Sequence, residues 1–410
     1  MIPYTKKILP NGLTVVVNRD RASKLAAVNI LYKVGARNED PRRTGFAHLF
    51  EHLMFRGTRE IPNFDLPVQM ASGDNNAFTN NDYTDFYITL PKDNLETALW
   101  LESDRMEGLD ITPAKLEAEK KVVIEEFRQR YLNQPYGDQT MLLRALAYKV
   151  HPYRWAAIGL TTDHIAEATL EDVEAFYRTH YRPSNAVLSI SADIEEERML
   201  ELAEKWFAPL ADRPADAAPI PQEPTQTEAR REEVERDVPA PTVAYHMGGR
   251  TDAGFYTADL VSDLLAGGDS GRLYTHLVKE RRLLSSVNAY VTGDVDPGLF
   301  VFTGQLLPGV TPEEAEAAFR EEIETLQTAS AAAREIEKVK NKFEANTLFG
   351  ELNVMNKAMN LGFYEMLGDL ALINREVGLY RAVGDDDIRS FSSRTFRPEN
   401  SSTLIYNTKK

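Results

Sequence analysis

The chain has 410 residues, no cysteine and a formal net charge of −16, with 47 Lys and Arg residues against 63 Asp and Glu. The missing cysteines exclude disulfides, thiolate metal sites, iron–sulfur clusters and cysteine nucleophiles. The acidity argues against binding to nucleic acid or to an anionic membrane, because both need clustered Lys and Arg. At about 150 residues per domain, the length predicts two or three domains.

The chain has no run of about 18 apolar residues that could span a bilayer. Its first seven residues, Met-Ile-Pro-Tyr-Thr-Lys-Lys, lack the apolar core of a secretion signal. We therefore expect a soluble protein of the cytoplasm, or of the periplasm if a signal peptide was removed.

In the first half of the chain, β-branched runs predict strands and apolar periodicity predicts helices. Thr112 and Pro113 have the residue types of a helix N-cap and first helical position. The expected strands cover 12–17, 26–32 and 78–90, the last with a turn at 80–82. The expected helices cover 45–54, 93–107 and 113–131.

The second half shows the same mixture. Its expected strands cover 243–247, 286–292 and 299–306, and its expected helices cover 256–265, 311–328, 331–350 and 353–368. Because runs of helices follow strands in each half, we predict the α+β class, with an antiparallel-rich sheet packed against helices in each of two domains.

An internal repeat supports two homologous domains. The segment 176–185 reads Phe-Tyr-Arg-Thr-His-Tyr-Arg-Pro-Ser-Asn, and 391–400 reads Phe-Ser-Ser-Arg-Thr-Phe-Arg-Pro-Glu-Asn. Matching residues are separated by a constant 215 positions, about half of the chain. An apolar run follows each segment. We therefore expect each domain to close with a helix, an Arg-Pro turn and a strand.

A linker is expected between the repeats. Six prolines and the charged run Arg230-Arg231-Glu232-Glu233 fall within residues 213–241, where apolar periodicity disappears until Val234. We place the first domain at 1–212, the linker at 213–234 and the second domain at 235–410.

The segment His48-Leu49-Phe50-Glu51-His52 is the strongest chemical signal. On a helix, residues four apart share a face, so His48 and His52 can bind one metal ion. Glu51 projects near the same edge and can take a proton from a water molecule. The alternative is a pair of surface histidines without metal. The apolar residues around the motif favour a buried helix, in which His and Glu need partners.

A catalytic zinc site needs a third protein ligand. The helix predicted over 113–131 offers Glu117, Glu119, Glu125 and Glu126. Glu119 and Glu126 are two turns apart on one face, and Glu125 is rotated by about 100°. Spacing alone leaves both Glu125 and Glu126 open as the third ligand.

The sequence resembles the M16 metallopeptidase family, which includes pitrilysin, insulin-degrading enzyme and the mitochondrial processing peptidase. The H-x-x-E-H motif, the later pair of glutamates and several shorter segments carry the resemblance over essentially the whole chain. It implies one zinc ion per chain, with His48, His52 and Glu126 as ligands. It further implies that Glu51 is the general base and that Glu119 supports the catalytic site.

The resemblance also implies a fold and a substrate site. In this family two homologous α+β domains form half of a clam-shell chamber, which four domains complete. A substrate peptide adds to an exposed sheet edge, to which Asn76, Ala77 and Phe78 correspond.

One departure from the family pattern concerns the second domain. Active members carry an Arg and a Tyr seven residues apart there, at positions where this chain has Val278 and Ser285. A tetrahedral intermediate needs such a partner besides the metal. A partner subunit could supply the pair, activity could be low, or Arg281 and Arg282 could substitute. We favour a homologous partner subunit over a second copy of this chain.

These observations lead to one main hypothesis, a zinc metalloendopeptidase subunit that hydrolyses short unfolded peptides as part of a heterodimer. The alternative is a non-catalytic subunit that binds peptides or serves a structural role. The intact H-x-x-E-H motif favours the first hypothesis, whereas Val278 and Ser285 favour the second.

Overall fold

A computed structural model describes residues 1–213, 215 and 218–408. The chain folds into two compact units, and each unit draws on several stretches of sequence. Unit 1 comprises Met1–Gln129, Trp155–Ile220 and Leu348–Asn374. Unit 2 comprises Arg130–Arg154, Pro221–Thr347 and Arg375–Lys410.

Unit 1 is built on a sheet that has six strands among the described residues, in the order β1-β2-β6-β3-β5-β4. All neighbours are antiparallel except β2 and β6, which are parallel. The central strands are almost wholly buried, because helices cover both faces of the sheet. The strands are β1 (Thr5–Ile8), β2 (Thr14–Arg19), β3 (Leu25–Tyr32), β4 (Asp74–Thr79), β5 (Thr84–Pro91) and β6 (Ala186–Ala192).

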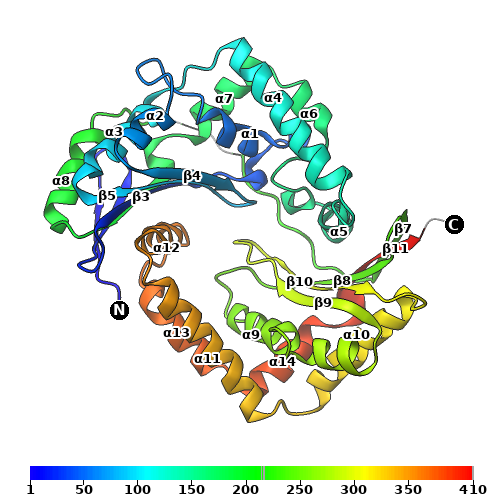
Figure 1. The fold of residues 1–410 in the computed structure, drawn as a ribbon. Coiled ribbons are helices and arrows are strands. Elements are labelled where there is room, and N and C mark those ends of the chain that lie inside the picture. The colour runs from blue at the N-terminus through cyan, green and yellow to red at the C-terminus, as the bar shows by residue number, and fades with distance from the viewer. Residues whose placement is uncertain (214, 216–217, 409–410) are drawn as a thin grey trace. The chain divides into compact units, whose positions relative to one another are not determined.

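The two faces of this sheet are covered by helices from different parts of the sequence (Figure 1). On one face, four helices of the first half contact the strands: α1 (Phe46–Leu53), α2 (Asp65–Met70), α3 (Leu95–Glu107) and α8 (Glu196–Phe207). Outside them, α4 (Pro113–Phe127) and α7 (Leu170–His180) pack against α1, and α6 (Thr162–Ala166) packs against α4. The other face packs against α12 (Val354–Met366), which comes from the second half. A Cβ atom at Gly362 of α12 would lie 2.9 Å from the side-chain nitrogen of Asn29 on β3, so glycine permits this close approach.

Unit 2 has a sheet of similar topology, with the strand order β7-β11-β8-β10-β9 among the described residues. β7 and β11 are parallel and the other neighbours are antiparallel. The strands are β7 (Arg230–Arg236), β8 (Ala240–His246), β9 (Leu284–Val291), β10 (Leu299–Leu306) and β11 (Ser401–Thr408). The helices of this part of the chain are α9 (Phe255–Ala266), α10 (Pro312–Thr328), α11 (Ala333–Gly350), α13 (Leu372–Ala382) and α14 (Asp385–Thr395).

A helix from the first half also packs in unit 2. Leu143 and Leu146 of α5 (Gln139–Ala147) share a core cluster with Ala244 of β8 and Leu404 of β11. The compact units therefore differ from the continuous domains 1–212 and 235–410 expected from the sequence. Each sheet buries one face under a helix that the sequence boundary would assign to the other domain.

Part of the expected linker is a strand. The charged run Arg230 to Glu233 opens β7, which pairs with β11 and has alternating half-buried and exposed residues. Among the described residues β7 pairs with no second strand, and charged side chains suit such an edge. A search for alternating apolar residues therefore does not detect β7, whose sequence is almost entirely charged. Residues 214, 216 and 217 of the expected linker lie outside the described residues.

The predicted α+β class with two sheets packed against helices is confirmed. The region 78–90 contains the end of β4, a turn and β5, so the expected strand pair is present. Thr112 caps α4 by accepting a hydrogen bond from the Lys115 backbone N–H, and Pro113 is the first helical residue, both as predicted. Within the described part of the chain, none of the helices combines the length and apolar character needed to cross a membrane.

Candidate metal centre

Helix α1 carries the two histidines on a partly exposed edge. Its other side is buried through Phe46, Ala47, Leu49, Phe50 and Leu53, which anchor the helix in unit 1. The side chains of His48 and His52 are 12% and 22% exposed. Their ring centroids lie 4.8 Å apart, as expected for residues one turn apart on a helix. The motif therefore presents two imidazoles to one side of α1.

Helix α4 lies against α1 and brings a carboxylate to the same place. The Glu126 side chain is 18% exposed, and its Oε2 atom lies 3.4 Å from His52 Nε2 and 3.8 Å from His48 Nε2. Glu125 is 56% exposed and accepts a hydrogen bond from Gln129. The helical rotation thus turns Glu126 toward the histidines and Glu125 toward solvent.

The three side chains can hold a metal ion. Ligand atoms of His48, His52 and Glu126 all lie within 4.8 Å of one another, and they form the one such group found among the described residues. Donor atoms bound tetrahedrally at about 2.0–2.1 Å from zinc lie roughly 3.3 Å apart. The distances involving Glu126 are close to that spacing, and two imidazoles with one carboxylate are a donor set typical of catalytic zinc.

Glu119 lies behind His52 rather than among the ligand atoms. Its Oε2 atom is 3.4 Å from His52 Nδ1, while its Oε1 atom accepts a hydrogen bond of 2.5 Å from Arg56 Nε. The Glu119 side chain is 2% exposed. A carboxylate at Nδ1 holds the imidazole with Nε2 toward the metal position.

Arg56 was not identified from the sequence. It comes four residues after His52, a spacing that brings side chains together on a helix and its continuation. Its contact with Glu119 stabilises the negative charge of a buried carboxylate. The sequence therefore did contain one indication of this residue, an arginine one helical turn after the H-x-x-E-H motif.

The electrostatics of the centre suit a cation. Burial acts to lower the pKa of His52, but the carboxylates of Glu119, Glu126 and Glu51 outweigh it, so the pKa lies above its usual value. Three acidic groups around two imidazoles produce a negative potential where the donor atoms converge. A divalent cation bound there would offset that charge and displace the proton from His52.

The expected substrate edge lies on β4, which pairs only with β5 among the described strands. β4 also packs beside α1. The backbone N–H of Ala77 donates to the side-chain oxygen of Asn76 at 2.9 Å. Asn76 is exposed, and Ala77 and Phe78 are half-buried.

The two positions that depart from the family pattern lie in unit 2. Val278 lies in the π-helical segment Tyr274–Glu280 and packs against the hydrophobic core. Ser285 lies at the start of β9, where its hydroxyl donates to the Gln305 carbonyl at 3.3 Å. Arg281 forms an exposed ion pair of 2.5 Å with Glu321. If an Arg replaced Val278, its guanidinium would have to extend away from the apolar side chains that surround this position.

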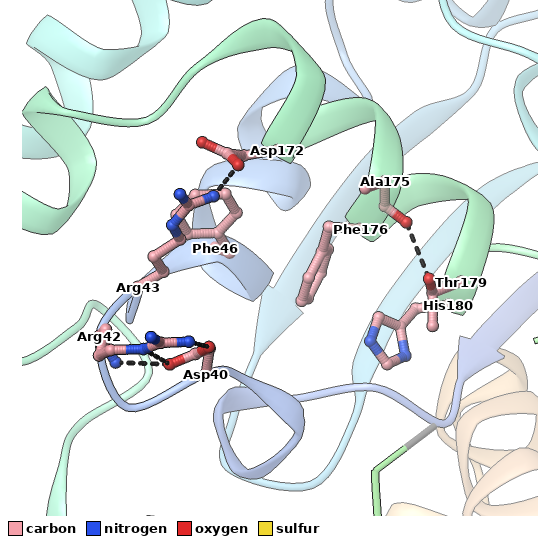
Figure 2. Close-up of a pocket in the computed structure, with 9 residues that line it drawn as sticks. All are labelled: Asp40, Arg42, Arg43, Phe46, Asp172, Ala175, Phe176, Thr179 and His180. Atoms are coloured by element: carbon pink, nitrogen blue, oxygen red, sulfur yellow. Dashed lines mark hydrogen bonds and ion pairs between the residues drawn. The ribbon is translucent and has the colours of Figure 1, made fainter. Parts of the chain in front are cut away.

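A separate pocket of about 570 Å³ opens between the loop before α1 and helix α7 (Figure 2). Phe46, Phe176 and His180 line it, and ion pairs join Arg42 to Asp40 and Arg43 to Asp172 across its surface (Figure 2). Residues 48, 52 and 126 of the metal centre do not line this pocket. It is therefore distinct from the metal centre.

The chain matches two family models. "Insulinase (Peptidase family M16)" covers residues 14–155, and "Peptidase M16 inactive domain" covers residues 167–343. Together the two models span the residues of the metal centre and most of the second half of the chain.

Individual proteins are similar as well. The "Zinc protease PqqE" of Helicobacter pylori is 32% identical over 340 residues, which cover 81% of this chain and 76% of the relative. The probable mitochondrial-processing peptidase subunit beta of Arabidopsis thaliana is 25% identical over 71% of this chain and 57% of its own length. A crystal structure of a protease from Helicobacter pylori superposes with a TM-score of 0.94 and 27% identity over 100% of both chains.

Proposed function

Because the chain belongs to the M16 family of peptidases, we propose that it is a zinc-dependent endopeptidase subunit that hydrolyses short unfolded peptides. The observation that carries the proposal is the convergence of His48, His52 and Glu126 from two helices within 4.8 Å. Each chain offers one such centre among its described residues, so the expected content is one zinc ion per chain.

The chemistry divides between the metal and the protein. Zinc, when bound, supplies a Lewis acid that polarises the scissile carbonyl and lowers the pKa of a water molecule. Glu51, one residue before His52 on α1, accepts the proton of the attacking water and later delivers it to the leaving amine. Glu119 acts through His52, whose ring it orients, and is a positioning residue.

The edge strand β4 gives the substrate a place to bind. An extended peptide can pair with the free side of an edge strand through main-chain hydrogen bonds, which tolerate many side chains. The proximity of β4 to α1 supports Asn76, Ala77 and Phe78 as the substrate edge.

We also propose that a homologous subunit completes the active site with an Arg and a Tyr. Val278 is half-buried against the hydrophobic core and the Ser285 hydroxyl donates to the Gln305 carbonyl, so neither position offers the donors expected for the oxyanion. One similar protein is named as a subunit of a processing peptidase, which agrees with division of the work between chains.

The second candidate function is a non-catalytic subunit that binds peptides. Val278 and Ser285 favour it, because neither is the Arg or the Tyr expected to bind the oxyanion. The two candidates differ in what the metal centre does, since a binding subunit has no need of Glu51 as a base.

Metal content and turnover test the proposal together. The purified chain should contain one zinc ion, and His48→Ala or His52→Ala should lose it because two ligands remain. Glu51→Gln should keep zinc but lower peptide hydrolysis by about 10² to 10⁴, the usual contribution of a general base. The rate is measured on the chain combined with its homologous subunit. Unchanged hydrolysis by Glu51→Gln, or full zinc occupancy in both histidine variants, would contradict the proposal.

A further inference from the structure

Helix α1, which carries His48 and His52, receives no side-chain hydrogen bond from its N-cap residue. Gly45 adopts a left-handed conformation with φ of 88°, and a Cβ atom there would lie 2.6 Å from the Ile158 carbonyl oxygen. Ser, Thr, Asp or Asn, which usually cap helices, therefore cannot fit at this position. The first N–H groups of α1 need an acceptor from elsewhere.

Glu39 supplies that acceptor from the turn before the helix. Its Oε2 atom accepts from the Gly45 N–H at 2.9 Å, and its Oε1 atom accepts from the Ala47 N–H at 2.8 Å. Ala47 immediately precedes His48, so the carboxylate fixes the backbone next to a metal ligand.

The Glu39 carboxylate is itself held in place. Its residue is 6% exposed, and the indole Nε1–H of Trp155 donates to its Oε2 atom at 3.1 Å. Trp155 is 1% exposed and also bonds to the Ala36 carbonyl at 3.1 Å. Burial raises the pKa of Glu39 to about 8, against the hydrogen bonds from Ala47, Gly45 and Trp155, which lower it.

The loop between Glu39 and α1 is fixed on its other side. Arg43 forms an ion pair with Asp172 of α7 (Figure 2). The Thr44 hydroxyl lies 2.9 Å from His164 Nδ1 and accepts a hydrogen bond from the Leu160 N–H at 2.8 Å. With the loop held in this way, the two hydrogen bonds of Glu39 add to the apolar packing that anchors α1.

We propose that Glu39 is a positioning residue of the metal centre, whose carboxyl group holds the first turn of α1 so that His48 meets His52 and Glu126. This inference rests on the proposed zinc function. Groups that orient metal ligands typically contribute 10- to 100-fold to metal affinity. Here the orientation passes through the backbone of α1 instead of through the imidazole ring.

Zinc affinity measured by competition with a chromogenic chelator tests the inference without any need for turnover. We expect Glu39→Ala to weaken zinc binding by about 10- to 100-fold. Glu39→Gln keeps one acceptor oxygen and should lose less. Substitution with cobalt(II) should give an altered visible spectrum in Glu39→Ala, because ligand geometry changes, and a spectrum closer to the wild type in Glu39→Gln.

Asp20→Asn is the matched control. Asp20 is another buried carboxylate of unit 1, 7% exposed, and pairs with Lys357 Nζ at 2.7 Å at the end of β2. Its loss should lower stability but leave zinc affinity and the cobalt spectrum unchanged. If Glu39→Ala does not fold, Glu39→Gln carries the comparison. Wild-type affinity and spectrum in folded Glu39→Ala would overturn the inference, as would wild-type affinity in Glu39→Gln if Glu39→Ala does not fold. Failure of the wild-type chain to bind zinc would instead overturn the proposed function itself.

Discussion

Asn185 and Asn400, 215 residues apart, make the same hydrogen bond in the two halves of the chain. The side-chain Nδ2 of each donates at 2.8 Å to the carbonyl of the residue five positions earlier, His180 in one case and Thr395 in the other. Each asparagine ends a 3-10 turn between a helix and a central strand. In both units the repeated Arg-Pro-x-Asn segment therefore connects the end of a helix to the start of a strand, and its asparagine is hydrogen-bonded to the last residue of that helix.

The asparagines should contribute similarly to stability. Replacing Asn185 or Asn400 with Ala leaves a helix-terminal carbonyl without its donor, which costs about 1–3 kcal/mol. Urea unfolding followed by circular dichroism would measure the loss. Asn407→Ala is the control, since its hydrogen bond to Glu233 is exposed and substitutions there should stay within about 0.5 kcal/mol. A neutral Asn185→Ala or Asn400→Ala variant would contradict the shared role.

The third ligand can be tested with two neighbouring glutamates. Glu126→Gln should weaken zinc binding, because Glu126 lies within 3.8 Å of both imidazoles. Glu125→Gln should not, because Glu125 is exposed and bonds to Gln129. Chelator competition on both variants gives the comparison, and the reverse order of affinities would place the ligand at position 125.

The features of the metal centre that depend on a single helix could be predicted from the sequence. The i,i+4 histidines, the cap at Thr112 and the two-turn spacing of Glu119 and Glu126 are all local features of single helices. The structure turns Glu119 toward His52 and Glu126 toward both histidines. The choice of Glu126 over Glu125 needed the family resemblance, because a rotation of about 100° cannot be read from spacing alone.

The sequence could not predict the exchange of covering helices. Gln139 and Val354 begin α5 and α12 at the same separation of 215 residues, so the two helices occupy equivalent places in the repeat. Each nevertheless packs on the sheet of the unit formed mainly by the other half. Tertiary packing of this kind depends on apolar faces that look alike in both helices. The role of Glu39 was missed for a related reason, since it caps α1 from six residues before Gly45.

His180 should make unit 1 sensitive to acid. Burial, with a smaller effect of the Arg182 guanidinium, lowers the pKa of His180 to about 4. The unfolded chain takes up this proton near pH 6.5, whereas the folded chain resists it. The stabilisation is therefore complete above pH 6.5 and declines as the pH falls toward 4, by about 2 kcal/mol between pH 7 and pH 5.

Tryptophan fluorescence measures this effect in unit 1, because Trp100, Trp155 and Trp206 all belong to that unit. In His180→Phe, which keeps an aromatic ring beside Phe176, the loss between pH 7 and pH 5 should shrink by about 2 kcal/mol. Equal pH dependence in the wild type and His180→Phe would show that other groups cause the acid sensitivity.

The chain alone should be a poor peptidase, and a homologous subunit should restore activity. Loss of one oxyanion donor typically costs about 10² to 10³ in kcat, and neither Val278 nor Ser285 can replace the expected Arg and Tyr. Reconstitution with a homologue that carries both residues should therefore raise peptide hydrolysis by at least that factor. Replacing the Arg or the Tyr of that homologue should remove the gain, although Glu51 of this chain is intact.

If the chain, purified free of any homologue, hydrolyses peptides as fast as the mixture, the proposal that two chains share the active site is wrong. Arg281→Ala and Arg282→Ala would then show whether these two residues supply the missing charge.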